Sequence, residues 1–169
     1  MRKNNLQELK MMKNPNINKY YLHWTAGHYS QFFNDYHILI DYDGSIYAST
    51  NDLTELKYHT WRRNTNAVGI AMCCCYGALA HSGYNTDFGA EPPTQAQIET
   101  MAKVVSVLCD DVNSDTVMTH CEAALLDDYG PFSGDPETRW DLWYLKDYDG
   151  QMKPGGDVIR GKAIWYQQN

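Results

Sequence analysis

The stretch 'NAVGIAMCCCYG', residues 66 to 77, constrains the fold more than any other part of the chain. Nearly all of its side chains are apolar or small, which is typical of a strand buried on both faces of its sheet. Its three consecutive cysteines would alternate between these faces and make a poor disulfide framework. Because the five cysteines are odd in number and match no structural zinc spacing, we expect synthesis in a reducing compartment.

Three further stretches predict strands. The segment 'YHILIDYDGSIYAS' has two β-rich runs around Asp43-Gly44, the strongest short hairpin signal in the chain. The segment 'NKYYLHW' predicts a strand that ends at His23, and 'DTVMTH' predicts a shorter strand that ends at His120.

The clearest helix is expected in 'PPTQAQIETMAKVVSVLCDD'. Prolines precede it, Thr94 is the expected N-cap with Gln97 three residues later, and apolar residues recur at spacings of three and four. Its apolar stripe must therefore lie on the sheet. A helical turn or two is expected in 'CEAALLDD', and a helix is possible at the end of the C-terminal tail. Strands mixed with helices indicate an α/β fold, a single domain over residues 1–169 with a central mixed β-sheet flanked by helices.

Charge and hydropathy exclude two classes of partner. The chain has 14 Lys and Arg against 21 Asp and Glu, a net charge of −7, and no basic cluster larger than 'WRRN', so we expect no nucleic-acid partner. The N-terminal 'MRKNNLQELKMMKN' lacks the apolar run of a secretory signal, and no window approaches the ~18 apolar residues of a membrane span. We therefore expect synthesis in the cytoplasm and no membrane span; the oligomeric state is left open.

Three polar residues are candidates for a metal site. His23 and His120 each end a predicted strand, and Asp141 follows the irregular 'YGPFSGDPETR' loop, so all three could meet at one edge of the sheet. Two imidazoles and a carboxylate are the ligand types of a catalytic zinc site. The chain has six histidines, however, and polar residues that are simply hydrogen-bonded at strand ends remain the alternative on residue types alone.

Four ordered motifs give this pattern a family context. They are 'YLHWTAG' at 21–27, 'DYHILIDYDGSIY' at 35–47, 'YHTWRRNTNAVGIAM' at 58–72 and 'THCEAALLDDYGPFSGDPETRWDLW' at 119–143. Together they resemble the type 2 N-acetylmuramoyl-L-alanine amidases, which include the amidase-type phage lysozymes and, more distantly, the peptidoglycan recognition proteins. The resemblance covers about residues 19–145 and leaves 146–169 as a C-terminal extension. It implies the peptidoglycan recognition protein-like amidase fold.

The resemblance also implies roles for individual residues. His23, His120 and Asp141 match the family's three zinc ligands. Tyr36 in 'DYHIL' matches its catalytic tyrosine, and His59 in the 'H-x-W-x-R-N' stretch matches a histidine that lines the cleft.

Two positions depart from the family pattern. Some members carry a glutamate as general base on the strand that here reads 'VGIAM', where this chain has Ala71. Arg139 stands two residues before Asp141, where the phage enzymes have a lysine that assists the chemistry. Because a guanidinium stays protonated, Arg139 can act only as an electrostatic donor.

The resemblance implies a zinc-dependent hydrolase that cuts the amide between N-acetylmuramic acid and L-alanine in bacterial peptidoglycan. Tyr36 and Arg139 would stabilise the oxyanion, and the proton donor to the leaving amine is left open. We expect a bacteriolytic phage or prophage endolysin that reaches the wall after holin-mediated release. The alternatives are a non-catalytic recognition module that binds peptidoglycan and a zinc amidase that acts on soluble muropeptides.

Overall fold

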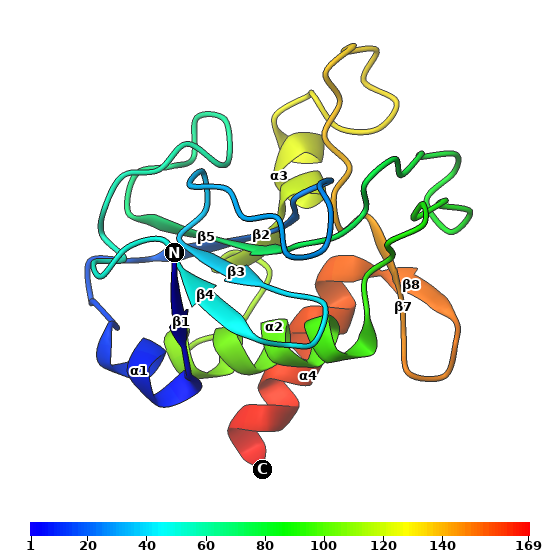
Figure 1. The fold of residues 1–169 in the computed structure, drawn as a ribbon. Coiled ribbons are helices and arrows are strands. Elements are labelled where there is room, and N and C mark those ends of the chain that lie inside the picture. Colours follow the sequence, from blue (N-terminus) through cyan, green and yellow to red (C-terminus); the bar gives the residue numbers. More distant parts are fainter.

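A six-stranded mixed β-sheet forms the centre of the molecule in a computed structural model that describes all residues 1–169 (Figure 1). The strand order is β1-β4-β3-β5-β2-β6. Strands β3, β5, β2 and β6 run parallel, whereas β4 pairs antiparallel with both β3 and β1. The strands are β1 (Arg2–Asn4), β2 (Lys19–Trp24), β3 (Ile38–Ile40), β4 (Ile46–Ala48), β5 (Ala67–Met72) and β6 (Val117–Thr119).

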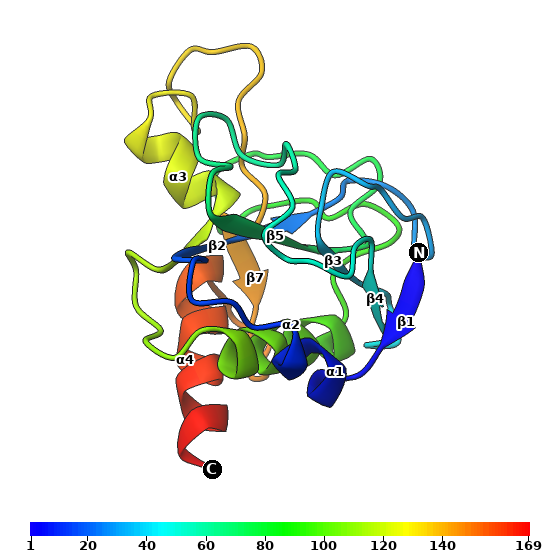
Figure 2. The same cartoon turned by 90° about the vertical axis from the view of Figure 1, so that its left-hand side faces the viewer.

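Four helices and a small hairpin surround this sheet. The helices are α1 (Leu6–Met11), α2 (Gln95–Leu108), α3 (His120–Leu126) and α4 (Gly155–Gln168), and the hairpin consists of β7 (Tyr144–Lys146) and β8 (Met152–Pro154). Helices α1, α2 and α4 lie on one side of the sheet, while α3 and several long loops rise on the other (Figures 1 and 2). The main apolar core fills the space between the sheet and the first group of helices. These layers confirm the predicted α/β fold with a mixed central sheet. None of the helices combines the length and the hydropathy of a membrane span.

Strand β5 is buried along its whole length, as predicted for a central strand. It ends at Met72, five residues before the end of the apolar stretch, because Cys75 adopts a left-handed backbone conformation with φ of 73°. The cysteines that follow the strand remain in the core as free thiols, and burial raises the pKa of Cys73 to about 12. Cysteines whose buried thiols stay protonated in this way act as packing residues.

The predicted hairpin is confirmed at Asp43-Gly44. Gly44 has φ of 85°, a conformation that side chains with a Cβ rarely adopt. The turn is closed by hydrogen bonds from the Gly44 and Asp41 amides to the carbonyls of Asp41 and Ser45. A Cβ at Gly44 would also lie 2.8 Å from Thr100 Oγ1 on α2, so the turn needs glycine for two reasons.

Helix α2 begins with the predicted capping box of Thr94 and Gln97. Gln97 has a second role that its spacing does not predict, because its side chain points into the core and is fully buried. Its Nε2 donates to the carbonyls of Ile40 and Cys73, 3.1 and 3.0 Å away, at the ends of β3 and β5. One side chain therefore caps the helix and ties it to two strands.

The predicted end of one strand at His120 is wrong. Strand β6 ends at Thr119, and His120 is the first residue of α3 because Thr119 and Glu122 form a capping box that starts the helix there. The expected turns in 'CEAALLDD' and the possible C-terminal helix are confirmed as α3 and α4. Strand β1, helix α1 and the β7–β8 hairpin were not predicted.

The change Gln97→Met tests the bridge from α2 to the sheet. It keeps the size of the side chain but leaves the Cys73 carbonyl without its donor, so we expect the free energy of unfolding to fall by ~1–3 kcal/mol in urea denaturation. Gln95→Met, an exposed position of the same helical turn, should change it by less than ~0.5 kcal/mol. Equal losses in the two variants would contradict this role of Gln97.

Candidate metal centre

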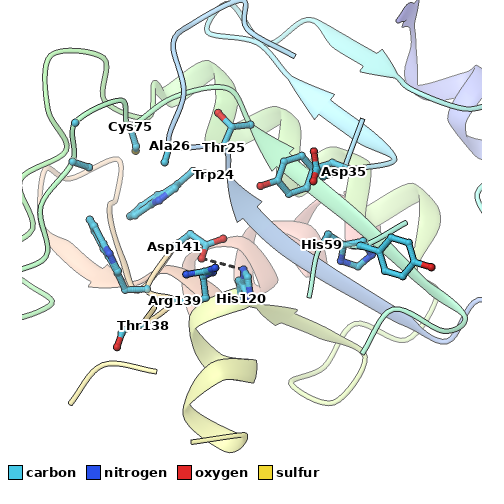
Figure 3. Close-up of a pocket in the computed structure, with 15 residues that line it drawn as sticks. Trp24, Thr25, Ala26, Asp35, His59, Cys75, His120, Thr138, Arg139 and Asp141 are labelled. Atoms are coloured by element: carbon cyan, nitrogen blue, oxygen red, sulfur yellow. Dashed lines mark ion pairs between the residues drawn. The ribbon is translucent and has the colours of Figure 1, made fainter. Parts of the chain in front are cut away.

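Three side chains from distant parts of the sequence converge on one point. His23 Nδ1 lies 3.1 Å from His120 Nδ1 and 3.0 Å from Asp141 Oδ2, and His120 Nδ1 lies 3.3 Å from Asp141 Oδ1. All three residues are buried, and the three ligand atoms fit within 4.8 Å of one another. Figure 3 shows Asp141 and His120 paired at the wall of a cavity. The structure thus brings together the three residues that the sequence singled out.

The register of the sheet places the two histidines. Strands β2 and β6 are parallel neighbours with Leu22 opposite Thr119, so the next residues, His23 and His120, leave the same edge of the sheet side by side. Asp141 reaches them from the segment between α3 and β7, where its carbonyl accepts a hydrogen bond from the Cys121 amide at 3.4 Å. Two neighbouring strand ends and one returning loop therefore build the site.

The charge states of these groups suit a metal ligand set. Burial lowers the pKa of His23 to about 4, although its hydrogen bond with Asp141 acts in the opposite direction, so the imidazole is neutral at neutral pH. For Asp141, burial raises the pKa, but the charge interactions and hydrogen bonds with His120 and His23 outweigh it and hold the pKa well below its ordinary range. A neutral imidazole and an ionised carboxylate are the forms that bind a metal.

The donor atoms also fit a cation geometrically. Two ring nitrogens and a carboxylate oxygen point at one another, and their lone pairs repel unless a proton or a metal ion lies between them. Nitrogen and oxygen donors in this number are typical of a zinc site that keeps a further position open. Cys121, the neighbour of His120, is buried, and burial raises its pKa above the ordinary value, so it is a packing residue here.

Thr60 supports His23 from behind, a residue that the sequence analysis missed. Its Oγ1 lies 3.3 Å from His23 Nε2 and 2.9 Å from His59 Nδ1, and the threonine is almost fully buried. When Nδ1 of His23 binds a metal, Nε2 carries the hydrogen, and Thr60 is the acceptor within its reach. The signal in the sequence was the 'H-x-W-x-R-N' stretch, in which the residue after the histidine makes this contact.

His59 lies at the floor of the site. It is only 7% exposed, and its ring packs edge-on against His23 with centroids 5.4 Å apart. Burial lowers its pKa far below the ordinary value, and its Nε2 is buried without a hydrogen-bond partner. Gly69 on β5 makes room for this ring, since a Cβ there would lie 2.6 Å from its Cγ. His59 is thus placed as a neutral supporting ring beneath His23 as well as a lining residue.

The same loop is fixed by two other residues of the stretch. Asn64 Oδ1 accepts hydrogen bonds from the backbone amides of His59 and Thr60 at 3.1 and 2.9 Å. Arg63 forms a two-pronged ion pair with Asp127, at 2.7 and 2.9 Å, just after α3. The arginine and asparagine of this stretch therefore hold the loop that supports His23.

Tyr36 and Arg139 border the metal centre on the open side. The Tyr36 ring lies 5.1 Å from that of His23, and burial followed by the charge of Asp141 raises its pKa above the ordinary value, so it remains a hydrogen-bond donor. Arg139 is exposed, and its side chain donates to the Glu137 carbonyl at 2.6 Å. Both line one cavity with His120, and Figure 3 shows Arg139 beside His120 and Asp141.

Two cavities meet at the metal centre. One, of about 390 Å³, has walls that include Trp24, Tyr36 and Trp140; the other, of about 810 Å³, is bordered by Trp61 and Tyr129. They share lining residues, namely Tyr58, His59, His120 and Arg139. His120 therefore borders both cavities and Asp141 one of them, and both cavities have aromatic rings in their walls.

Two substitutions test the centre. His120→Ala should abolish zinc binding while the protein stays folded, because it removes one of three ligands.

Thr60→Val should weaken zinc binding by about 10- to 100-fold, because it removes the acceptor that orients His23. Affinity is measured by competition with a chromophoric chelator. Thr65→Val, an exposed position of the same loop, is the control; equal affinities for the two valine variants would exclude a role for Thr60.

Comparison with known proteins identifies the family of this chain. A family described as N-acetylmuramoyl-L-alanine amidase matches residues 10–136, a segment that contains His23 and His120 and stops before Asp141. A solved structure, the peptidoglycan recognition protein PGRP-Hd from Alvinella pompejana, is similar with 19% identity over 56% of this chain and a TM-score of 0.36. The match spans 65% of that chain, slightly less than two thirds of its length. A search of curated proteins found no match. The chain belongs to the N-acetylmuramoyl-L-alanine amidase family.

Proposed function

We propose that this protein is a zinc-dependent amidase that cleaves the bond between N-acetylmuramic acid and L-alanine in bacterial peptidoglycan. The observation that carries the proposal is the convergence of the ligand atoms of His23, His120 and Asp141 within 4.8 Å, beside a cavity lined by His120 and Asp141. Membership of the family supplies the substrate class. A retained set of three ligands favours catalysis over recognition alone.

His23, His120 and Asp141 would hold the zinc. When bound, zinc polarises the amide carbonyl as a Lewis acid and lowers the pKa of water toward neutrality. Burial of the three ligands keeps competing water away from the donor atoms, and the neutral state of His23 leaves its Nδ1 lone pair free for the metal.

Two donors line the cavity in which the carbonyl oxygen would become negatively charged. Tyr36 keeps its proton because its pKa is raised, so its hydroxyl can donate a hydrogen bond to the oxyanion. Arg139 has a backbone carbonyl as its intramolecular partner and brings a fixed positive charge to the same cavity. Donors that are already oriented toward a developing charge contribute a few kcal/mol each, on the order of 3.

The groove accounts for the form of the substrate. The scissile amide has a sugar on one side and a peptide on the other, and two cavities that share lining residues border His120, so one could take each part. Aromatic rings such as Trp61 and Trp140 offer flat apolar surfaces with polar edges, which suit both sugars and peptides.

The structure narrows the choice of proton donor. His59 is neutral at neutral pH, and its ring is almost completely buried, so it is a poor acid for the leaving amine. Ala71, which occupies the position of the family's glutamate, is fully buried beside His23 in the sheet. Besides Asp141, the one carboxylate that lines the cavity with Tyr36 is the exposed Asp35.

Release from a phage-infected cell through a holin stays a prediction of the sequence.

Digestion of purified peptidoglycan tests the activity. We expect peptides with a free N-terminal L-alanine, identified by mass spectrometry, and we expect their release to stop with a chelator and to return with zinc. Intact wall with the protein bound to it would instead indicate a recognition module. Cleavage of isolated muropeptides without cleavage of intact wall would indicate a soluble substrate.

Tyr36→Phe tests the oxyanion donor. It should lower kcat by about 10²- to 10³-fold, as expected when one such donor is lost, with zinc still bound at full stoichiometry. Tyr84→Phe, an exposed tyrosine outside both cavities, is the control for loss of a phenol hydroxyl. An unchanged kcat in the Tyr36 variant would remove this residue from the mechanism.

A further inference from the structure

Helix α4 lies outside the segment matched by the family, yet its first turn reaches the back of the metal centre. In both ribbon views its N-terminal end rises toward the sheet below α3, whereas its C-terminal end projects away from the molecule (Figures 1 and 2). The helix packs against β6, the strand that leads directly into His120, and against β7, which follows Asp141. It therefore touches the chain beside two of the three candidate ligands.

Arg160 makes the first of these contacts. It is 9% exposed, and its guanidinium forms a two-pronged ion pair with both oxygens of Glu122, at 2.8 Å each. The same guanidinium donates to the Val117 carbonyl on β6 at 2.9 Å and to Asp157 at 3.1 Å. A planar group held by this many acceptors fixes the position of each of them.

Glu122 connects Arg160 to the turn that precedes His120. Its Oε1, which accepts from Arg160, also accepts from the Thr119 amide at 2.8 Å, while the Thr119 hydroxyl accepts from the Glu122 amide at 3.0 Å. These bonds set the turn at which β6 becomes α3, and His120 is the first residue after that turn. Glu122 therefore links the guanidinium of Arg160 to the turn at Thr119 through its two carboxylate oxygens and its backbone amide.

Two glycines at the start of α4 bring the helix close enough. A Cβ at Gly155 would overlap the carbonyl oxygen of Leu142, the residue after Asp141, and a Cβ at Gly156 would overlap the carboxylate of Glu122. The Gly155 amide also donates to the Trp143 carbonyl at 3.0 Å. The same end of one helix thus presses on the chain beside Asp141 and on the side chain that fixes His120.

We propose that the first two turns of α4, residues 155 to 160, are a positioning element that sets the geometry of His120 and Asp141 toward the metal. The inference rests on the proposed zinc function. His23 lies on the central strand β2, and none of its hydrogen bonds involves α4, so loosening α4 would displace His120 and Asp141 relative to His23. Ligand sets lose affinity when the groups that orient them are removed.

A second ion pair of α4 serves as a control that separates the positioning role from a role in overall stability alone. Lys162, two residues after Arg160, forms ion pairs with Glu99 on α2 at 2.9 Å and with Asp147, just after β7, at 3.6 Å. Neither ion pair involves α3 or the residues next to Asp141. Arg160→Met and Lys162→Met both replace a cation on α4 with an apolar chain. Only the first breaks the link to Glu122.

The test measures zinc affinity by chelator competition, the absorption spectrum of the cobalt-substituted protein and the unfolding temperature. Arg160→Met should weaken zinc binding by about tenfold or more and change the cobalt spectrum at a temperature where the variant is folded. Lys162→Met should lower the unfolding temperature while its affinity and spectrum remain those of the original protein. Gly156→Ala places a Cβ against both the Glu122 carboxylate and the Arg160 guanidinium, so it should disturb their ion pair, reproduce the Arg160 effect and serve if Arg160→Met does not fold.

Equal affinities in Arg160→Met and Lys162→Met, or an unchanged affinity in Gly156→Ala, would overturn the positioning role and leave the zinc function intact. Failure of the original protein to bind zinc would overturn both. The two failures are therefore distinguished by the original protein alone.

Discussion

The parallel pairing of β2 with β6 is the constraint on which the rest of the site depends. With Leu22 opposite Thr119, the strands deliver His23 and His120 to the same edge of the sheet, so that two Nδ1 atoms 97 residues apart in sequence lie 3.1 Å from each other. A shift of the register by one residue would turn one imidazole to the other face of the sheet. The core between the sheet and α1, α2 and α4 keeps that register, because strands on both sides of β2 are buried.

Burial favours the neutral form of His23, opposes the ionised form of Asp141, and so creates the need for supporting contacts. A neutral His23 and an ionised Asp141 in a buried site are favourable only when each is held by a partner. Thr60 and His59 hold His23 from one side, while the Arg160 and Glu122 pair stabilises the turn at His120 from the other. The metal centre is thus enclosed by two independent supports, one from the loop before β5 and one from the C-terminal helix.

Regular secondary structure carries two of the candidate ligands, whereas irregular segments of the chain form the groove walls. Two ligands lie at strand or helix ends, where backbone hydrogen bonds fix them, and the groove walls come from loops that carry Trp61, Tyr129 and Trp140. Such an arrangement is typical of sites in which a scaffold sets the reacting groups and loops adapt to the substrate. The same loops contribute Arg139, which brings positive charge into the cavity of a protein whose net charge is −7.

Local signals in the sequence determined the parts of the structure that depend on neighbouring residues. The turn at Asp43-Gly44, the Thr94 cap of α2 and the burial of β5 follow from glycine conformation, capping and hydropathy, and the structure has all three. The family motifs also indicated His23, His120 and Asp141, which the structure brings together. Only the tertiary structure decided that Thr60 supports His23, that Gln97 joins α2 to two strands, and that Arg160 reaches Glu122. Each of these contacts is a hydrogen bond between residues far apart in the sequence: at least 24 residues for Gln97 and at least 37 for Thr60 and Arg160. The physical reason is that no local pattern of residues encodes which distant acceptor a polar side chain will meet.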